Sequence, residues 1–239
     1  MSDKNLISKV TINRLLTDVK AVYNNKLAGE GIFYKHDEED LLKGYALIIG
    51  PENTPYSYGY FLFKFDFPLD YPYSPPTVTY LTNDGYTRFH PNFYKCGKVC
   101  VSILNTWRGD QWSSCQTIRS ILLTLISLMD EMPLLNEPGI SKKHKDHDPY
   151  NKIITYKKFD TAIYKILKKE ILPANFYNFY DIIVESFIKN YDKILLELES
   201  YCNTIPYNKV LYTSCYNLSA RCGHYKIRDK MIEFKDNLS

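Results

Sequence analysis

Apolar residues recur at helical spacing close to the start of the chain. Those that share one helical face are Ile12, Leu15, Leu16, Val19 and Val22. This spacing predicts an amphipathic helix over residues 4–24. Similar patterns predict helices over residues 150–169 and 176–202, divided at Pro173. The pattern after residue 203 is ambiguous, and residues 218–234 fit one more helix.

Between the first helix and residue 83 the pattern changes to the alternation that is typical of strands. It is clearest in Tyr60–Phe67, where every second residue is phenylalanine and one face is strongly aromatic. Four strands are predicted in all, over residues 31–35, 44–49, 60–67 and 77–82. The connections between the later strands are rich in proline and glycine, which favours tight turns and a meander.

The segment from Asn83 to Ile118 has no clean period, although both tryptophans and three of the six cysteines lie in it. A long irregular stretch inside a compact domain is typical of a functional segment. A further helix is predicted to begin near Ser113, because Ser113 and Gln116 have the spacing of a capping box. Its apolar stripe runs through Ile121 and Leu125, and it is expected to end before Pro133.

Composition and charge narrow the class of protein. The chain has 239 residues and is 45% hydrophobic, which is too apolar for a disordered protein. A net charge of +3 without a dense basic stripe does not favour a nucleic-acid partner. The longest apolar run, residues 118–129, is too short to cross a membrane. The first residues lack the apolar stretch of a signal peptide, so we expect a cytoplasmic location, with the nucleus as an alternative.

The residues best suited to chemistry lie between His90 and Leu104. Asn92 precedes Cys100 by eight residues, and Gly97 between them lets the backbone fold back. An amide side chain could therefore lie over a thiol, which is a candidate nucleophile. A Cys–His hydrolase dyad with His90 is disfavoured, because no oxyanion turn or third orienting residue is evident.

Four motifs in and around this region resemble those of the ubiquitin-conjugating enzymes. They are Y-P-x-x-P-P at residues 71–76, H-P-N at 90–92, G-K-V-C-x-S-I-L at 97–104, and a Trp-Ser pair at 112–113. The resemblance covers residues 6–140 and is closest to the large enzyme Z type, which has extra residues between the cysteine and the second tryptophan. It implies an α+β fold: an N-terminal helix, a four-stranded antiparallel meander, an active-site loop, a central helix and a C-terminal helical extension. We place the core in residues 1–145 and the extension in residues 146–239.

The resemblance implies a carrier of ubiquitin. Cys100 would take ubiquitin as a thioester from an activating enzyme and pass it to a lysine of a protein substrate, usually with a ligase. A thiol with a pKa of about 8.5 is sufficiently ionised at neutral pH to exchange with a thioester. The reaction needs no cofactor or metal. A conjugating enzyme for another ubiquitin-like modifier and a non-catalytic ubiquitin-binding variant are the alternatives.

Two other residues match catalytic positions of the family. Asn92 would donate a hydrogen bond to the oxyanion, or would brace the active-site loop, and both roles stay open. Glu137 would orient the incoming lysine and favour its deprotonation. The alternative for Glu137 is a solvated carboxylate in the turn before Pro138.

The resemblance also implies binding surfaces. The ligase-facing surface would comprise Tyr73, Ser113, Ser114 and Cys115. Leu123 would lie on the helix face that receives the conjugated ubiquitin, with core packing as the alternative. Lys9 and Arg14 are weaker candidates for contact with the activating enzyme. Ser114 replaces the usual proline of the family, which puts the usual ligase partners in doubt.

A zinc-stabilised scaffold is a rival from another class. Cys96 and Cys100 form C-x3-C, and His144 and His147 form H-x2-H, both of which are conceivable ligand pairs. Only one cysteine needs a catalytic role, and we expect no metal.

Overall fold

The computed structural model describes residues 6–24 and 27–238. Within these ranges the chain divides into two compact units. The first takes its described residues from Met1–Ile48, Phe61–Leu81 and Asn92–Leu128, and the second comprises Ile49–Tyr60, Thr82–Pro91 and Met129–Ser239. The segments of the two units alternate along the chain. The domain boundary that we place at residue 145 stays a prediction.

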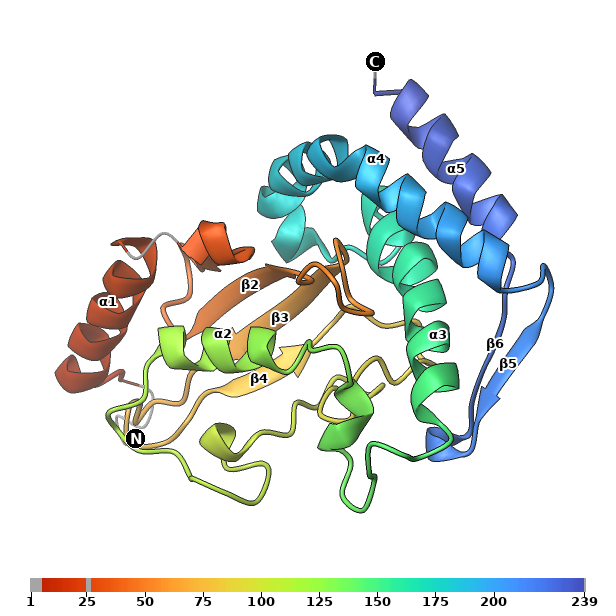
Figure 1. The fold of residues 1–239 in the computed structure, drawn as a ribbon. Coiled ribbons are helices and arrows are strands. Elements are labelled where there is room, and N and C mark those ends of the chain that lie inside the picture. Colours follow the sequence, from red (N-terminus) through yellow and green to blue (C-terminus); the bar gives the residue numbers. More distant parts are fainter. Residues whose placement is uncertain (1–5, 25–26, 239) are drawn as a thin grey trace. The chain divides into compact units, whose positions relative to one another are not determined.

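The first unit contains an N-terminal helix, a four-stranded sheet and a second helix (Figure 1). Its elements are α1 (Lys9–Asn24), β1 (Ile32–His36), β2 (Lys43–Ile49), β3 (Tyr60–Asp66), β4 (Thr77–Tyr80) and α2 (Ile118–Ser127). The strand order is β1-β2-β3-β4, and the pairs β1–β2 and β3–β4 are antiparallel. The predicted α+β fold, helix and meander are confirmed. Positions 4 and 5 of the predicted first helix lie outside the described residues, and the helix begins later than predicted, at Lys9.

Aromatic side chains fill the core of the first unit. Phe63 pairs with Tyr80 across β3 and β4, and its ring lies 5.5 Å from that of Tyr80 and 5.3 Å from that of Phe93. Phe61 and Phe65 are also fully buried. Because Phe93 belongs to the irregular segment, this cluster attaches that segment to the sheet.

The second unit is mainly helical. Its elements are α3 (His147–Lys157), α4 (Tyr180–Thr204), β5 (Val210–Thr213), β6 (Leu218–Arg221) and α5 (His224–Asp236). A π-helical turn over Lys158–Lys165 continues α3, and short 3₁₀ turns lie at Leu27–Glu30, Ser102–Leu104, Pro133–Asn136, Ala174–Phe179 and Cys215–Asn217. The predicted helices over residues 150–169 and 176–202 are confirmed. In the part of the chain that the structure describes, no helix is long and apolar enough to span a bilayer.

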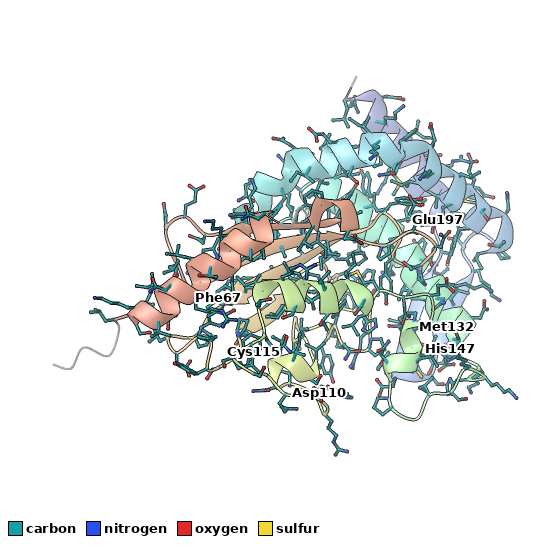
Figure 2. All side chains as sticks on the ribbon, turned by 60° about the vertical axis from the view of Figure 1, so that its left-hand side comes forward. Phe67, Asp110, Cys115, Met132, His147 and Glu197 are labelled. Atoms are coloured by element: carbon teal, nitrogen blue, oxygen red, sulfur yellow. The ribbon has the colours of Figure 1, made fainter. Side chains whose placement is uncertain are left out.

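A buried lysine ties two parts of the second unit together. Lys158 is fully buried, and its Nζ donates to Glu197 Oε1 at 2.6 Å and to Ser57 Oγ at 3.2 Å. Glu197 projects from α4 (Figure 2). Burial lowers the pKa of Lys158, and the Glu197 carboxylate acts in the opposite direction. The pair joins α4 to the π-helical turn, and removal of either partner would leave the other charge without its counter-ion.

Two predicted helix starts later in the chain, those of α2 and of the last helix, are wrong. Helix α2 begins at Ile118 and not near Ser113, and its capping box is formed by Thr117 and Ser120. The carbonyls of Ser114 and Gln116 instead accept hydrogen bonds from Arg14, which holds them outside the helix.

The predicted last helix begins later than expected, at His224. The residues before it form the second strand of the β5–β6 hairpin, which the ambiguous pattern of the tail did not reveal.

Candidate active site

A tight hairpin in the first unit carries Cys100. Phe93 and Val99 form an antiparallel bridge, and the amide of Tyr94 donates to the carbonyl of Lys98 at 2.9 Å. The chain turns at Gly97, so Asn92 and Cys100 lie opposite each other. The eight-residue spacing of the sequence is therefore the span of this hairpin.

Asn92 binds the backbone of Cys100 in both directions. The amide N–H of Cys100 donates to the carbonyl of Asn92 at 2.9 Å, and Asn92 Nδ2 donates to the carbonyl of Cys100. The predicted proximity of Asn92 to Cys100 is thus present. The bracing role of Asn92 has a direct geometric basis, while its role as an oxyanion donor stays a prediction.

Gly97 fixes this hairpin to the edge of the sheet. Its carbonyl accepts from the amide of Tyr80 at 2.7 Å, beside a bridge between Thr79 and Lys98. Gly97 has φ of +91°, and a Cβ there would lie 3.0 Å from Thr79 Cγ2 and 3.1 Å from the Tyr80 carbonyl oxygen. Only glycine fits without strain, so this position sets how closely the cysteine hairpin approaches β4.

Thr106 closes the loop that follows the cysteine. Its hydroxyl accepts from the amide of Val101 at 2.9 Å and lies 2.9 Å from the carbonyl of Val99. Sequence reasoning did not identify Thr106, because a single threonine after an irregular segment has no distinctive spacing. Its hydroxyl determines the backbone path on both sides of Cys100.

The hydrogen bonds around Cys100 limit what can stabilise an oxyanion. The amides of Cys100 and Val101 already donate to Asn92 and Thr106, respectively. These two amides can therefore donate to a tetrahedral intermediate only if those bonds rearrange. Cys100 is a free thiol, and the residue is 2% exposed. Acyl exchange thus requires local access to its sulfur.

The predicted ligase-facing residues come together on the first unit. Tyr73 is 70% exposed, and Ser113, Ser114 and Cys115 are also exposed. Figure 2 labels Cys115. Trp112 joins the two segments, because its Nε1 donates to the carbonyl of Pro72 at 2.7 Å. These residues are available to a partner, and ligase binding stays a prediction.

Arg14 supports this surface from α1. Its Nη1 donates to the carbonyl of Ser114 at 2.6 Å, and its Nε contacts Asp18 Oδ1 at 3.0 Å. The buried Asp18 also accepts a hydrogen bond from the Tyr71 hydroxyl. The guanidinium is thus engaged inside the protein, which weakens the case for Arg14 as a contact to the activating enzyme.

The other two surface candidates on the helices of the first unit remain accessible. Lys9 is exposed on α1, and Leu123 is half-buried on α2. Their proposed contacts with the activating enzyme and with conjugated ubiquitin stay predictions.

Glu137 belongs to the second unit and is not a freely solvated carboxylate. It is half-buried, and its Oε2 accepts a hydrogen bond from the Tyr216 hydroxyl at 2.5 Å. Burial, followed by the hydrogen bond to Glu137, raises the pKa of Tyr216 above its usual range. Tyr216 lies 79 residues further along the chain, so no local sequence pattern could have linked it to Glu137.

His90 is a buried structural residue of the second unit. It is fully buried, its ring lies 6.3 Å from that of Tyr56, and its Nε2 lies 3.4 Å from Asn136 Nδ2. The Tyr56 hydroxyl donates to the neighbouring carbonyl of Phe89 at 2.7 Å. These contacts support the loop, and the absence of a Cys–His dyad stays a prediction.

The described residues contain one group of three potential metal ligands, which is His144, Asp146 and Cys215. In this group Asp146 Oδ2 accepts hydrogen bonds from Ser214 Oγ at 2.7 Å and from the amide of Cys215 at 2.8 Å, and the expectation of no metal stays a prediction. His147 does not join the group, and its Nε2 lies 2.7 Å from the carbonyl of Ser141. The histidine and cysteine pairs singled out in the sequence do not assemble into a metal site among these residues.

Comparisons with known proteins agree with this geometry. A family profile described as ubiquitin-conjugating enzyme matches residues 14–157. Ubiquitin-conjugating enzyme E2 Z from Danio rerio is 39% identical over 193 residues, which are 80% of this chain and 58% of that protein. The Homo sapiens E2 Z is 39% identical over 180 residues, covering 70% of this chain and 50% of that protein. The human dual E2 ubiquitin-conjugating enzyme/E3 ubiquitin-protein ligase BIRC6 is 44% identical over 125 residues, covering 48% of this chain and 2% of its own. The chain thus spans between half and three fifths of these E2 Z relatives.

Proposed function

The chain belongs to the ubiquitin-conjugating enzyme family, and from this membership we propose that it carries ubiquitin as a thioester on Cys100 and transfers it to a substrate lysine. The observation that carries the proposal is the pairing of Asn92 with Cys100 on a hairpin fixed to the sheet edge. The proposed partners are an activating enzyme, a ligase and a protein substrate. We propose a cytoplasmic location, as the sequence suggests.

The first step of the proposed reaction is thioester exchange. The Cys100 thiolate attacks the carbonyl carbon of the ubiquitin C-terminus, and the cysteine of the activating enzyme leaves as a thiolate. One carbon–sulfur bond forms as another breaks, so the exchange is close to neutral in free energy and needs no strong base.

The second step is transfer to an amine. The nitrogen of the substrate lysine attacks the thioester, an amide bond forms, and Cys100 leaves as a thiolate. The lysine must lose a proton, and Glu137 is the proposed group that orients it and accepts that proton. Asn92 is the proposed side-chain donor to the oxyanion, for which its amide would have to leave the carbonyl of Cys100.

A thioester-charging assay tests the proposal. The protein is mixed with ATP, ubiquitin and an activating enzyme, and the products are separated with and without reducing agent. We expect an adduct of one ubiquitin that reducing agent removes. Cys100→Ala should abolish it, and Cys100→Ser should form an ester that reducing agent does not cleave.

Cys96→Ala is the matched control, because Cys96 is an exposed thiol in the same hairpin. It should charge like the parent protein. Charging that persists in Cys100→Ala would contradict the assignment of the acceptor thiol. Charging with another ubiquitin-like modifier, but not with ubiquitin, would contradict the choice of modifier.

A further inference from the structure

The C-terminal segment holds the carboxylate of Glu137 through Tyr216. Only Oε2 of Glu137 receives the tyrosine hydroxyl, at 2.5 Å, so Oε1 is the oxygen that Tyr216 leaves for another donor. A hydrogen bond to an ionised carboxylate is stronger than one between neutral groups. The contact therefore restricts rotation of a carboxylate that would otherwise sample several orientations.

Tyr216 is itself held in place. It lies in the turn between β5 and β6 and has φ of +62°, a backbone conformation that non-glycine residues seldom adopt. Its ring faces the guanidinium of Arg88, whose central carbon lies 4.3 Å from the ring centroid. The ring of Tyr150 lies 6.2 Å away on α3. The contacts of the ring with Arg88 and Tyr150 thus fix the position of the Tyr216 hydroxyl.

The same contacts connect this turn to the H-P-N motif. Arg88 Nη2 donates to the carbonyl of Pro91, and the Tyr150 hydroxyl donates to the carbonyl of Arg88 at 2.8 Å. Glu137, Tyr216 and Arg88 therefore form a continuous set of contacts that ends at the residue before Asn92.

We propose that Tyr216 is a positioning residue that fixes the Glu137 carboxylate for the incoming lysine, an inference that rests on the proposed function. Glu137 Oε1 would take the proton from the lysine nitrogen as the amide bond forms and the bond to Cys100 sulfur breaks. The proton then passes to water. In this proposal Tyr216 acts only through the orientation of Glu137.

The test separates charging from discharge in Tyr216→Phe. Charged protein is purified from the activating enzyme and mixed with free lysine or with hydroxylamine, a nucleophile that is already unprotonated at neutral pH. We expect normal charging, about tenfold slower discharge to lysine, and unchanged discharge to hydroxylamine. The matched control is Tyr212→Phe, because Tyr212 is an exposed tyrosine on the same hairpin.

A double-mutant cycle with Glu137→Gln shows whether Tyr216 acts through that carboxylate. Glu137→Gln alone should slow discharge to lysine by about 100-fold, as expected for loss of a general base. Adding Tyr216→Phe to Glu137→Gln should cause no further loss.

The inference would be overturned by unchanged lysine discharge in Tyr216→Phe, or by an equal loss with both nucleophiles. A full additional loss in the Glu137→Gln background would also overturn it, because Tyr216 would then act independently of Glu137. Absence of any thioester on the parent protein would overturn the proposed function itself, and this inference with it.

Discussion

Asn92 and Cys100 are joined by two hydrogen bonds that run in opposite directions. The backbone of Cys100 donates to the backbone of Asn92, and the side chain of Asn92 returns a bond to the carbonyl of Cys100. The second bond is buried, so its loss leaves a carbonyl without that donor. The asparagine therefore shapes the backbone that presents the thiol, whatever it also contributes to the reaction.

We expect Asn92→Ala to lower the free energy of unfolding by about 1–3 kcal/mol, because the carbonyl of Cys100 loses a buried donor. Urea denaturation measures this, and Asn13→Ala on the exposed side of α1 is the control. Unchanged stability would argue against the bracing role. A loss of about 100-fold or more in lysine discharge at equal charging would assign the oxyanion role as well.

Gly97→Ala should destabilise the protein by about 2 kcal/mol, because alanine is strained at a φ of +91° and its methyl group meets Thr79 and Tyr80. The midpoint of thermal unfolding would report it. Gly29→Ala provides a matched comparison, because Gly29 has no atom within 4 Å of the added methyl group. Equal stability of the two variants would show that the hairpin adjusts without cost.

Arg14→Ala should lower the free energy of unfolding by about 2–3 kcal/mol, since it removes two donors to the segment before α2 and the cation beside Asp18. Ligase-stimulated discharge should fall further than discharge to free lysine, because this segment forms part of the predicted ligase-facing surface. Lys9→Ala, at an exposed position of α1, should leave stability unchanged. A selective loss of charging in Arg14→Ala would instead favour a role at the activating enzyme.

Asp84 should make stability depend on pH in the acid range. Burial alone would raise its pKa, but hydrogen bonds from Lys157 and from the amides of Thr87 and Tyr86 outweigh this and lower the pKa of Asp84 to about 2. The ordinary pKa of an unfolded aspartate is about 3.9. The stabilisation, about 2 kcal/mol, is therefore complete above about pH 5 and is lost progressively as the pH falls through about 2.

Asp84→Asn tests this by denaturation across the same range. The variant should lose stability at pH 7 and show a weaker pH dependence below pH 4. A parallel pH profile for the two proteins would contradict the assignment. The contribution of Asp84 to the free energy of unfolding should not change between pH 5 and pH 8.

The cysteines should differ in their reaction with a maleimide at neutral pH. Cys96 and Cys115 are exposed and should be labelled first, while the buried Cys100 should follow more slowly. Burial and the hydrogen bond to Asp146 raise the pKa of Cys215 to about 11, so very little thiolate is present and labelling should be slowest of these four. Mass spectrometry of peptides measures the order, and all six cysteines should react in urea. Fast labelling of Cys215 in the folded protein would contradict the environment described for it.

Local pattern predicted the elements of the first unit well. The alternation in Tyr60–Phe67 corresponds to buried phenylalanines, because burial of one face imposes such a period. The helical spacing from Ile12 to Val22 marks the buried face only in part, because Leu15 and Val22 are buried whereas Leu16 is exposed. The predicted start of α2 was wrong because Thr117 and Ser120 form the capping box. The carbonyls of Ser114 and Gln116 instead accept hydrogen bonds from Arg14, about a hundred residues earlier in the chain. The β5–β6 hairpin was missed because its strands are only four residues each and because the exposed residues of β5, Val210 and Tyr212, are also apolar.

The candidate site also contains residues that the sequence identifies and contacts that only the structure shows. Cys100, Asn92 and the turn at Gly97 were identifiable from the sequence because they lie within one hairpin, where spacing along the chain determines proximity. Thr106 lies only five residues after Val101, but a single threonine in an irregular loop has no distinctive spacing. The contact of Tyr216 with Glu137 depended on how the chain folds back on itself over 79 residues. Single side chains that meet through tertiary folding leave no period and no motif, so only the three-dimensional structure could decide which of 22 tyrosines holds the carboxylate.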